Sequence, residues 1–236
     1  LIGGGDVYQL SALHNVNFGI RNDTFVTGYV TSEEALDPAF PSFDFLISGL
    51  GWLVRDGKTY VRESFSTTTG DGESMAPQTT GVQFLTVHSA RTALGHDAEG
   101  NLMLLQIEGE TWVRGMTLYE FADFAVELGF MNAINLDGGG SATMTQNHTL
   151  VSEPSWKCPD APYNASEYFR CEKKVSSITC IHAMAPPFVD ASLLKRYEHP
   201  IPSSVSTSTP TLVPTSSPSV TFTLHPTRQN SETGDG

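Results

Sequence analysis

Three consecutive glycines, Gly138, Gly139 and Gly140, place the tightest constraint on how this chain can fold. Each glycine costs about 0.5–1 kcal/mol of backbone entropy inside a helix or strand, so such a run is expected only where the chain turns. The apolar segment 132–136 before the glycines is typical of a buried strand, and Asp137 and Ser141 border them. We therefore predict a strand that ends in a glycine-rich loop carrying one carboxylate and one hydroxyl.

Such a loop can have a chemical role. Successive backbone N–H groups in a glycine turn can form a concavity that binds an anion, and Asp137 would then lie beside an oxyanion site. The alternative is an ordinary tight turn in which Asp137 bonds its own backbone. No Lys follows the glycines, so the loop is not a P-loop, and the spacing does not match the dinucleotide fingerprint.

The segments before this loop predict hairpins. Turn-forming residues separate three pairs of alternating or apolar segments, namely 16–21 and 25–30, 51–55 and 59–62, and 91–96 and 102–107. Residues 64–80 are rich in Thr, Ser, Gly and Asp, so we interpret them as a flexible loop.

One main helix is expected at 117–128, where Thr117 and Glu120 form a capping box and Gly129 supplies the stop. A further strand is expected at 175–181. This order of elements favours an α+β domain, a mixed sheet of hairpins with one main helix, over a doubly wound sheet.

The last part of the chain has a different composition. Residues 200–227 are mostly Ser, Thr and Pro, and such a segment cannot bury enough apolar surface to offset the entropy of ordering. We therefore predict a folded domain over residues 1–194 and a disordered, mucin-like stalk over 195–236.

The charge of the chain excludes some partners. The formal net charge is -13, with 13 basic and 26 acidic residues, which argues against binding to nucleic acid or to an anionic membrane surface. Attachment to a membrane is expected only through an anchor outside this chain. No His, Asp and Glu cluster has metal-ligand spacing, so neither a metal nor another cofactor is predicted. The sequence leaves a homo-oligomer open.

The cysteines and sequons indicate a secretory protein. Cys158 and Cys171 are expected to close a local disulfide, which leaves Cys180 to pair with a cysteine upstream of Leu1. Three sequons, at Asn22, Asn147 and Asn164, would permit N-glycosylation in the same compartment.

Two segments, residues 132–143 and 89–97, closely resemble the phosphodiester glycosidase family. The resemblance extends from about residue 14 to about residue 183 and includes segments 18–21, 27–29 and 51–55 and the three cysteines. It implies a hydrolase that removes N-acetylglucosamine from an N-acetylglucosamine-1-phospho-mannose diester, which exposes mannose 6-phosphate on the glycans of lysosomal enzymes in the Golgi. It also implies a further strand, and a cysteine suited to Cys180, upstream of Leu1.

The resemblance and the chemistry together suggest roles for individual residues. Arg91 is expected to clamp the phosphate, because a planar guanidinium can hold two phosphate oxygens. Asp137 is expected to act as base or nucleophile, and Asn135 to bind sugar hydroxyls on the same face of the strand. The remaining expected residues are His96 and Glu108 as further catalytic groups, and Thr92, Asp97, Gly138, Gly139, Gly140 and Ser141 as substrate-binding groups.

Two qualifications accompany these roles. His96 and Asp97 are adjacent on a strand and point to opposite faces, so at most one of them would face the site. A distance between Glu108 and Asp137 of about 5 Å would indicate a retaining mechanism, and one of about 6.5–9.5 Å an inverting mechanism. Two other functions remain open, a non-catalytic module that binds phosphorylated glycans and a phosphodiester glycosidase for another sugar phosphate.

Overall fold

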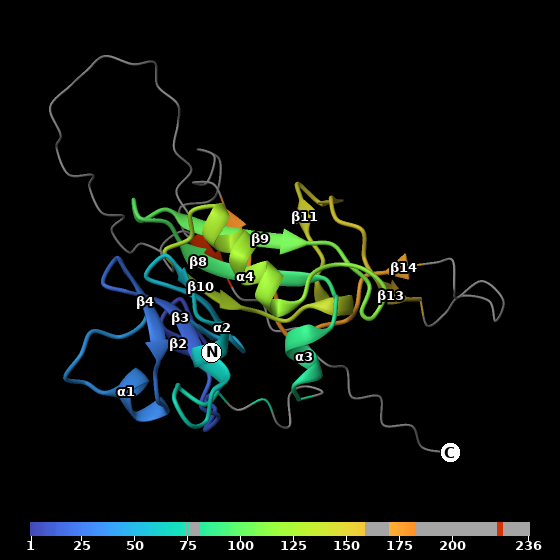
Figure 1. Cartoon of the computed structure of the whole chain (residues 1–236). Coiled ribbons are helices and arrows are strands. Elements are labelled where there is room, and N and C mark those ends of the chain that lie inside the picture. The colour runs from blue at the N-terminus through green and yellow to red at the C-terminus, as the bar shows by residue number, and fades with distance from the viewer. Residues whose placement is uncertain (74, 76–80, 159–169, 183–220, 224–236) are drawn as a thin grey trace, which may run out of the picture.

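A computed structural model describes residues 1–73, 75, 81–158, 170–182 and 221–223 (Figure 1). Its main body contains two five-stranded sheets in which every described strand pair is antiparallel. In spatial order the first sheet consists of β2 (Asp6–Val7), β1 (Ile2–Gly3), β5 (Phe45–Ser48), β3 (Val16–Arg21) and β4 (Thr24–Tyr29). The second consists of β7 (Lys58–Thr59), β6 (Trp52–Arg55), β10 (Asn132–Asn135), β8 (Arg91–His96) and β9 (Leu102–Ile107).

The remaining elements are short, apart from one helix. The helices are α1 (Ser32–Leu36), α2 (Val61–Phe65), α3 (Gln83–Thr86), the longer α4 (Leu118–Glu127) and the 3-10 turn η1 (Gly139–Ser141). Two-stranded ribbons pair β11 (Thr145–Gln146) with β12 (Thr149–Leu150), β13 (Trp156–Lys157) with β14 (Arg170–Cys171), and β15 (Cys180–His182) with β16 (Thr221–Thr223).

The first and third expected hairpins are confirmed, as β3–β4 and β8–β9, with residues paired throughout each. The main helix is confirmed with its capping box: the Glu120 N–H donates to Thr117 Oγ1, and the Thr117 N–H donates to Glu120 Oε2. The buried strand before the glycines is β10, at the centre of the second sheet. Hairpins and one main helix therefore describe the architecture.

Several expected details are wrong. The sheets are not mixed, because every described strand pair in them is antiparallel, including pairs distant in sequence such as β10 with β6. The second hairpin has a return strand of only two residues, β7, because the chain enters α2 at Val61. The start of the expected flexible loop lies in α2, and Glu73 is only 3% exposed. Of the expected strand 175–181, only Cys180 and Ile181 are extended, in β15.

Two cores explain the layering. One lies between the second sheet and α4, where Leu53 and Ala133 meet Phe121 and Ala125. The other lies between the two sheets and contains Phe18, Phe45, Trp52, Leu94 and Ile134. Alternation along β10 explains this, since Ala133 and Ile134 face opposite sides. The second sheet is thus covered on both faces, as Figure 1 shows for α4.

The predicted boundary near residue 194 and most of the predicted stalk fall outside the described residues. Of the residues assigned to the stalk, the structure describes β16, which pairs with β15. Across the described ranges, no helix is both long enough and apolar enough to cross a membrane.

Candidate active site

The glycine-rich loop leaves β10 and passes the start of β8. The Leu136 N–H donates to the Thr92 carbonyl at 2.8 Å, and the Gly139 N–H donates to the Ala90 carbonyl at 2.9 Å. A Cβ at position 138 would lie 2.5 Å from the Ala90 oxygen, and Gly139 has a φ of +53°. A side chain at either position would therefore clash with backbone or strain it, which explains the glycines in physical terms.

Most of the N–H groups of the glycine-rich loop are hydrogen-bonded within the protein. The Gly138 N–H donates to Asp137 Oδ1, and those of Ser141 and Ala142 donate to the carbonyls of Gly138 and Gly139. These bonds form because the loop closes into η1 instead of an open concavity. Within the described part of the chain, the Gly140 N–H is the only one from 138–142 without a recorded acceptor.

Asp137 lies on the surface at the beginning of the loop. Its Oδ1 accepts from the Gly138 N–H at 2.9 Å, which is the backbone contact expected of an ordinary turn. No described residue donates to Oδ2, so this oxygen faces solvent and can meet a substrate or a water molecule.

Asn135, two residues earlier, is 3% exposed and is held by backbone on two sides. Its N–H donates to the Gly51 carbonyl at 2.9 Å, and its Nδ2 donates to the Leu50 carbonyl at 3.0 Å. Its Oδ1 is buried without a hydrogen-bond partner. An acceptor in that state needs a donor from water or a ligand, since a buried unpaired oxygen is costly.

Two hydroxyls of the same loop are in a similar state. Ser141 Oγ and Thr143 Oγ1 are buried, and no described residue forms a hydrogen bond with either atom. Ser141 was expected to contact substrate, whereas Thr143 was not singled out, although a hydroxyl two residues beyond Ser141 was a readable signal. Together with Asn135 Oδ1 they give this region three buried polar atoms whose partners the described residues do not supply.

Arg91 begins β8 and is 2% exposed. Its Nη2 donates to the carbonyls of Phe84 and Val87 at 2.9 and 2.8 Å, and its Nε donates to the Met116 carbonyl at 3.2 Å. Burial lowers the pKa of the guanidinium to about 10, so the group stays charged at neutral pH. These contacts fit a residue that holds α3 and the segment before α4 against the sheet. Direct contact between Arg91 and phosphate stays a prediction.

Arg91→Lys is expected to lower the free energy of unfolding by about 1–3 kcal/mol, because the three N–H donors of an ammonium sit on one atom and cannot reach carbonyls spread around a planar guanidinium. Denaturant titration measures this loss, and the exposed Arg62→Lys is the matched control. A variant of unchanged stability with a raised KM would instead indicate the phosphate clamp.

His96 and Asp97 lie at the other end of the sheet. His96 pairs with Asn132, the first residue of β10, so Asp137 lies roughly 16 Å further along at about 3.3 Å per residue. Asp97 accepts from the N–H and Nδ2 of Asn101 in the hairpin turn. Both residues line a separate pocket of about 400 Å³ with Phe25 and Asn132. The structure therefore does not bring them to the glycine-rich loop.

Thr92 and Glu108 remain at the loop end of the sheet. Thr92 meets the loop through its carbonyl, which accepts from the Leu136 N–H. Glu108 follows the last residue of β9, and its Oε1 accepts from the Glu153 N–H at 2.7 Å. Because β8 lies between β9 and β10, about 10 Å separates the backbones that carry Glu108 and Asp137.

Trp156, which was not expected in the site, packs against Gly140 and forms one wall beside the glycine-rich loop. A Cβ at Gly140 would lie 2.8 Å from Cε3 of Trp156, and Lys173 Nζ lies 5.1 Å from the centre of the Trp156 ring. Trp156 pairs with Cys171 across β13 and β14, and the expected Cys158–Cys171 disulfide joins these strands. Cys180 is a free thiol among the described residues, and its proposed upstream partner stays a prediction.

Glu73, which was expected to lie in a flexible loop, is buried and holds the backbone of Gly51 and Trp52 next to the site. Its carboxylate accepts from the N–H groups of Gly51 and Trp52, from Ser64 Oγ and from the Tyr29 hydroxyl, at 2.7–3.1 Å. Burial raises the pKa of this carboxyl, although the hydrogen bonds oppose that shift. Tyr29 lies in the first sheet and Trp52 in the second, so Glu73 joins both sheets and fixes Gly51, which in turn holds Asn135.

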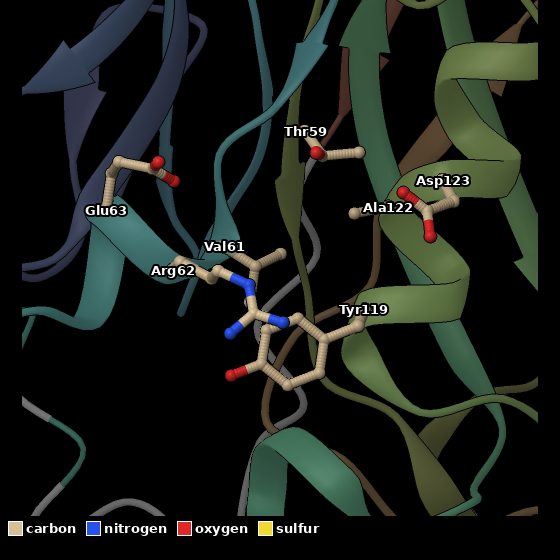
Figure 2. Close-up of a pocket in the computed structure, with 7 residues that line it drawn as sticks. All are labelled: Thr59, Val61, Arg62, Glu63, Tyr119, Ala122 and Asp123. Atoms are coloured by element: carbon tan, nitrogen blue, oxygen red, sulfur yellow. The ribbon is translucent and has the colours of Figure 1, made fainter.

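A different pocket, of about 200 Å³, lies between α2 and α4 (Figure 2). In that pocket the Arg62 guanidinium lies over the Tyr119 ring, 5.0 Å from its centre. None of the expected site residues lines it. Nowhere in the described ranges do three or more His, Cys, Asp or Glu residues form a group that could hold a metal ion.

Comparisons with known proteins identify the relatives of this chain. The sequence profile described as phosphodiester glycosidase matches residues 3–168. The N-acetylglucosamine-1-phosphodiester alpha-N-acetylglucosaminidases of Bos taurus and Homo sapiens are 45% and 46% identical over 183 and 179 residues, or 76% and 75% of this chain. The matched region spans 32% of each of those relatives, about a third of their length.

A solved structure resembles the chain as well. It is the catalytic domain of the zebrafish N-acetylglucosamine-1-phosphodiester alpha-N-acetylglucosaminidase, auto-inhibited by its pro-peptide, with a TM-score of 0.62 and 40% identity. The alignment covers 74% of this chain and 54% of that one. The glycine-rich loop, β8 and β10 all lie inside the region that the family profile matches.

Proposed function

Because the chain belongs to the phosphodiester glycosidase family, we propose that it removes N-acetylglucosamine from an N-acetylglucosamine-1-phospho-mannose diester. The product would be mannose 6-phosphate on the phosphorylated N-glycans of lysosomal enzymes. The observation that carries this proposal is the loop 137–143, where a solvent-facing carboxylate oxygen accompanies the unpartnered oxygens of Ser141 and Thr143. Relatives with that enzymatic name share 45–46% of their aligned residues with this chain.

The proposed reaction breaks the bond between C1 of N-acetylglucosamine and the phosphate oxygen. Water supplies the hydroxyl that C1 gains, and the electron pair of the broken bond leaves with the phosphate monoester. Oδ2 of Asp137 would take a proton from that water or attack C1 itself, and both routes pass through an oxocarbenium-like carbon. A phosphate monoester is a good leaving group, so its protonation matters less than in an ordinary glycosidase.

The other polar atoms of the loop would orient the substrate. The Gly140 N–H and the hydroxyls of Ser141 and Thr143 can donate to phosphate oxygens, which carry the charge that develops on the leaving group. Asn135 Oδ1 is an acceptor, so it suits a hydroxyl or the acetamido N–H of the sugar. In this arrangement Asn135 binds the sugar, the loop binds phosphate and Asp137 performs the chemistry.

The Golgi lumen is the compartment that this activity would require. The Cys158–Cys171 disulfide is typical of an oxidising compartment. Asn22 and Asn147 occupy the exposed turns of the β3–β4 and β11–β12 hairpins, where an oligosaccharide can be accommodated. We propose N-glycosylation at both. Asn164 falls outside the described residues.

The test is incubation of the full-length protein with a synthetic N-acetylglucosamine-α-1-phospho-6-mannose diester, followed by chromatographic measurement of free N-acetylglucosamine. Release of the sugar with formation of mannose 6-phosphate supports the proposal. Tight binding of the diester without release would assign the loop to a non-catalytic glycan-binding module. If the protein cleaves only another diester from a panel of substrates, its substrate is a different sugar phosphate.

A further inference from the structure

Trp112 lies at the tip of a tight loop between β9 and α4. Glu110 and Arg114 pair as an antiparallel bridge at its base, and the N–H groups of Val113 and Arg114 both donate to the Glu110 carbonyl. Trp112 at the tip has a φ of +72°, and its side chain is 65% exposed. The loop thus presents an indole ring to solvent from a base held by backbone hydrogen bonds.

Burial in the hydrophobic core does not explain why a tryptophan with a left-handed backbone occupies this exposed position. A left-handed backbone is unfavourable for a bulky residue, and such outliers gather at ligand-binding sites because other contacts enforce them. Here the Trp112 N–H donates to the His88 carbonyl at 3.0 Å, which fixes the backbone in that state. The indole itself buries little surface, so it returns little of the hydrophobic stabilisation that a buried tryptophan supplies.

The same loop is attached to the glycine-rich loop. Thr111 Oγ1 and Ser89 Oγ are hydrogen-bonded at 2.8 Å, and both hydroxyls border Gly139. A Cβ at Gly139 would lie 3.1 Å from Thr111 Oγ1 and 3.5 Å from Ser89 Oγ. Trp112 is therefore one residue away from an atom that lines the proposed phosphate site.

We propose that Trp112 forms a stacking subsite for the second sugar of the diester, the mannose that stays on the phosphate after cleavage. This inference rests on the proposed function. The loop runs from Asn135, buried against Leu50, outward to Gly139 beside Thr111. With N-acetylglucosamine at Asn135 and phosphate at the loop, the mannose extends toward the open side, where Trp112 lies.

The chemistry of a pyranose suits an indole. One face of a mannose ring presents C–H groups, and an aromatic face carries partial negative charge that attracts them. The hydroxyls on the ring edge remain in water, which fits an exposed subsite and a substrate attached to a large glycan. The subsite would therefore recognise the sugar on the leaving side and not the bond that is cleaved.

Two substrates separate this role from others. Trp112→Ala in the full-length protein is expected to raise KM about three- to tenfold for the mannose-containing diester, the range expected for loss of one stacking contact. The same variant should keep the wild-type kcat/KM for a diester in which a methyl group replaces mannose. Trp112→Tyr, which retains an aromatic face, should recover part of the loss. The matched control is Val113→Ala, since Val113 is 70% exposed on the same loop and should leave both substrates unaffected.

Other results would overturn the subsite. Equal losses on both diesters, with an unchanged melting temperature, would mean that Trp112 shapes the glycine-rich loop. No loss on either diester, or a loss only on an intact glycoprotein, would exclude stacking on mannose. If wild-type protein cleaves neither diester, the proposed function itself fails, which is distinct from failure of the subsite alone.

Discussion

Asp137→Asn is expected to reduce the release of N-acetylglucosamine by about 10²–10⁴-fold, the range associated with loss of a positioned acid or base. The amide keeps the shape of the side chain, and its oxygen can still accept from the Gly138 N–H. It cannot take a proton from water or attack C1. Binding of the diester, measured by calorimetry on the inactive variant, should therefore stay near the wild-type affinity.

The control for this substitution is Asp123→Asn, on the exposed face of α4, which should leave the rate unchanged. If the Asp137→Asn variant turns over at the wild-type rate, Asp137 has only a turn-forming role, which is consistent with its contact with the Gly138 N–H. Glu108 would then be the next carboxylate to replace, because it lies at the same end of the sheet.

Glu73→Ala is expected to cause the largest loss of stability, about 3 kcal/mol or more. The substitution would leave the Gly51 N–H and the Ser64 hydroxyl without their acceptor and the Trp52 N–H with only Ser64 Oγ, and each unsatisfied buried donor costs about 1–3 kcal/mol. Denaturant titration at neutral pH measures the change, with the exposed Glu99→Ala as control. A loss below that of an ordinary surface substitution would show that water replaces the carboxylate at little cost.

The pH dependence of stability gives an independent check on Glu73. Its pKa is raised in the folded protein above the ordinary value of 4.5, so the folded state binds a proton more tightly than the unfolded state. The stability associated with this group is fully present below the unfolded pKa and is lost as pH rises through the folded pKa. Glu73→Gln cannot titrate, and the difference in unfolding free energy between wild type and this variant should change across that window.

Much of the fold was predictable because local signals determined it. Alternation and turn residues identified β3–β4 and β8–β9, and the pair Thr117 and Glu120 located the start of α4. The segment after Ser64 was not predictable. Its composition is polar, yet Glu73 is buried by contacts with Gly51 and Tyr29, which are distant in sequence and come together only through tertiary packing.

The candidate site was predictable to a smaller extent. The glycines, Asn135, Asp137 and Ser141 belong to one continuous segment, so their proximity follows from the chain itself. The sequence does not show that His96 lies away from the loop, because sharing a strand with Arg91 does not say which end of that strand meets the loop. The guanidinium of Arg91 was expected to clamp phosphate, and only the packing of α3 and Met116 around it determines its three carbonyl partners.

The position of Trp156 has a consequence for how the protein responds to reduction. The two large sheets contain no cysteine, so their folding is independent of thiol chemistry, whereas the hairpin that carries Trp156 is closed by Cys158 and Cys171. The position of Trp156 beside Gly140 consequently depends on the oxidised pair Cys158–Cys171, whereas the two large sheets do not. Reduction of this disulfide is therefore expected to loosen Trp156 beside Gly140 while the two large sheets stay intact.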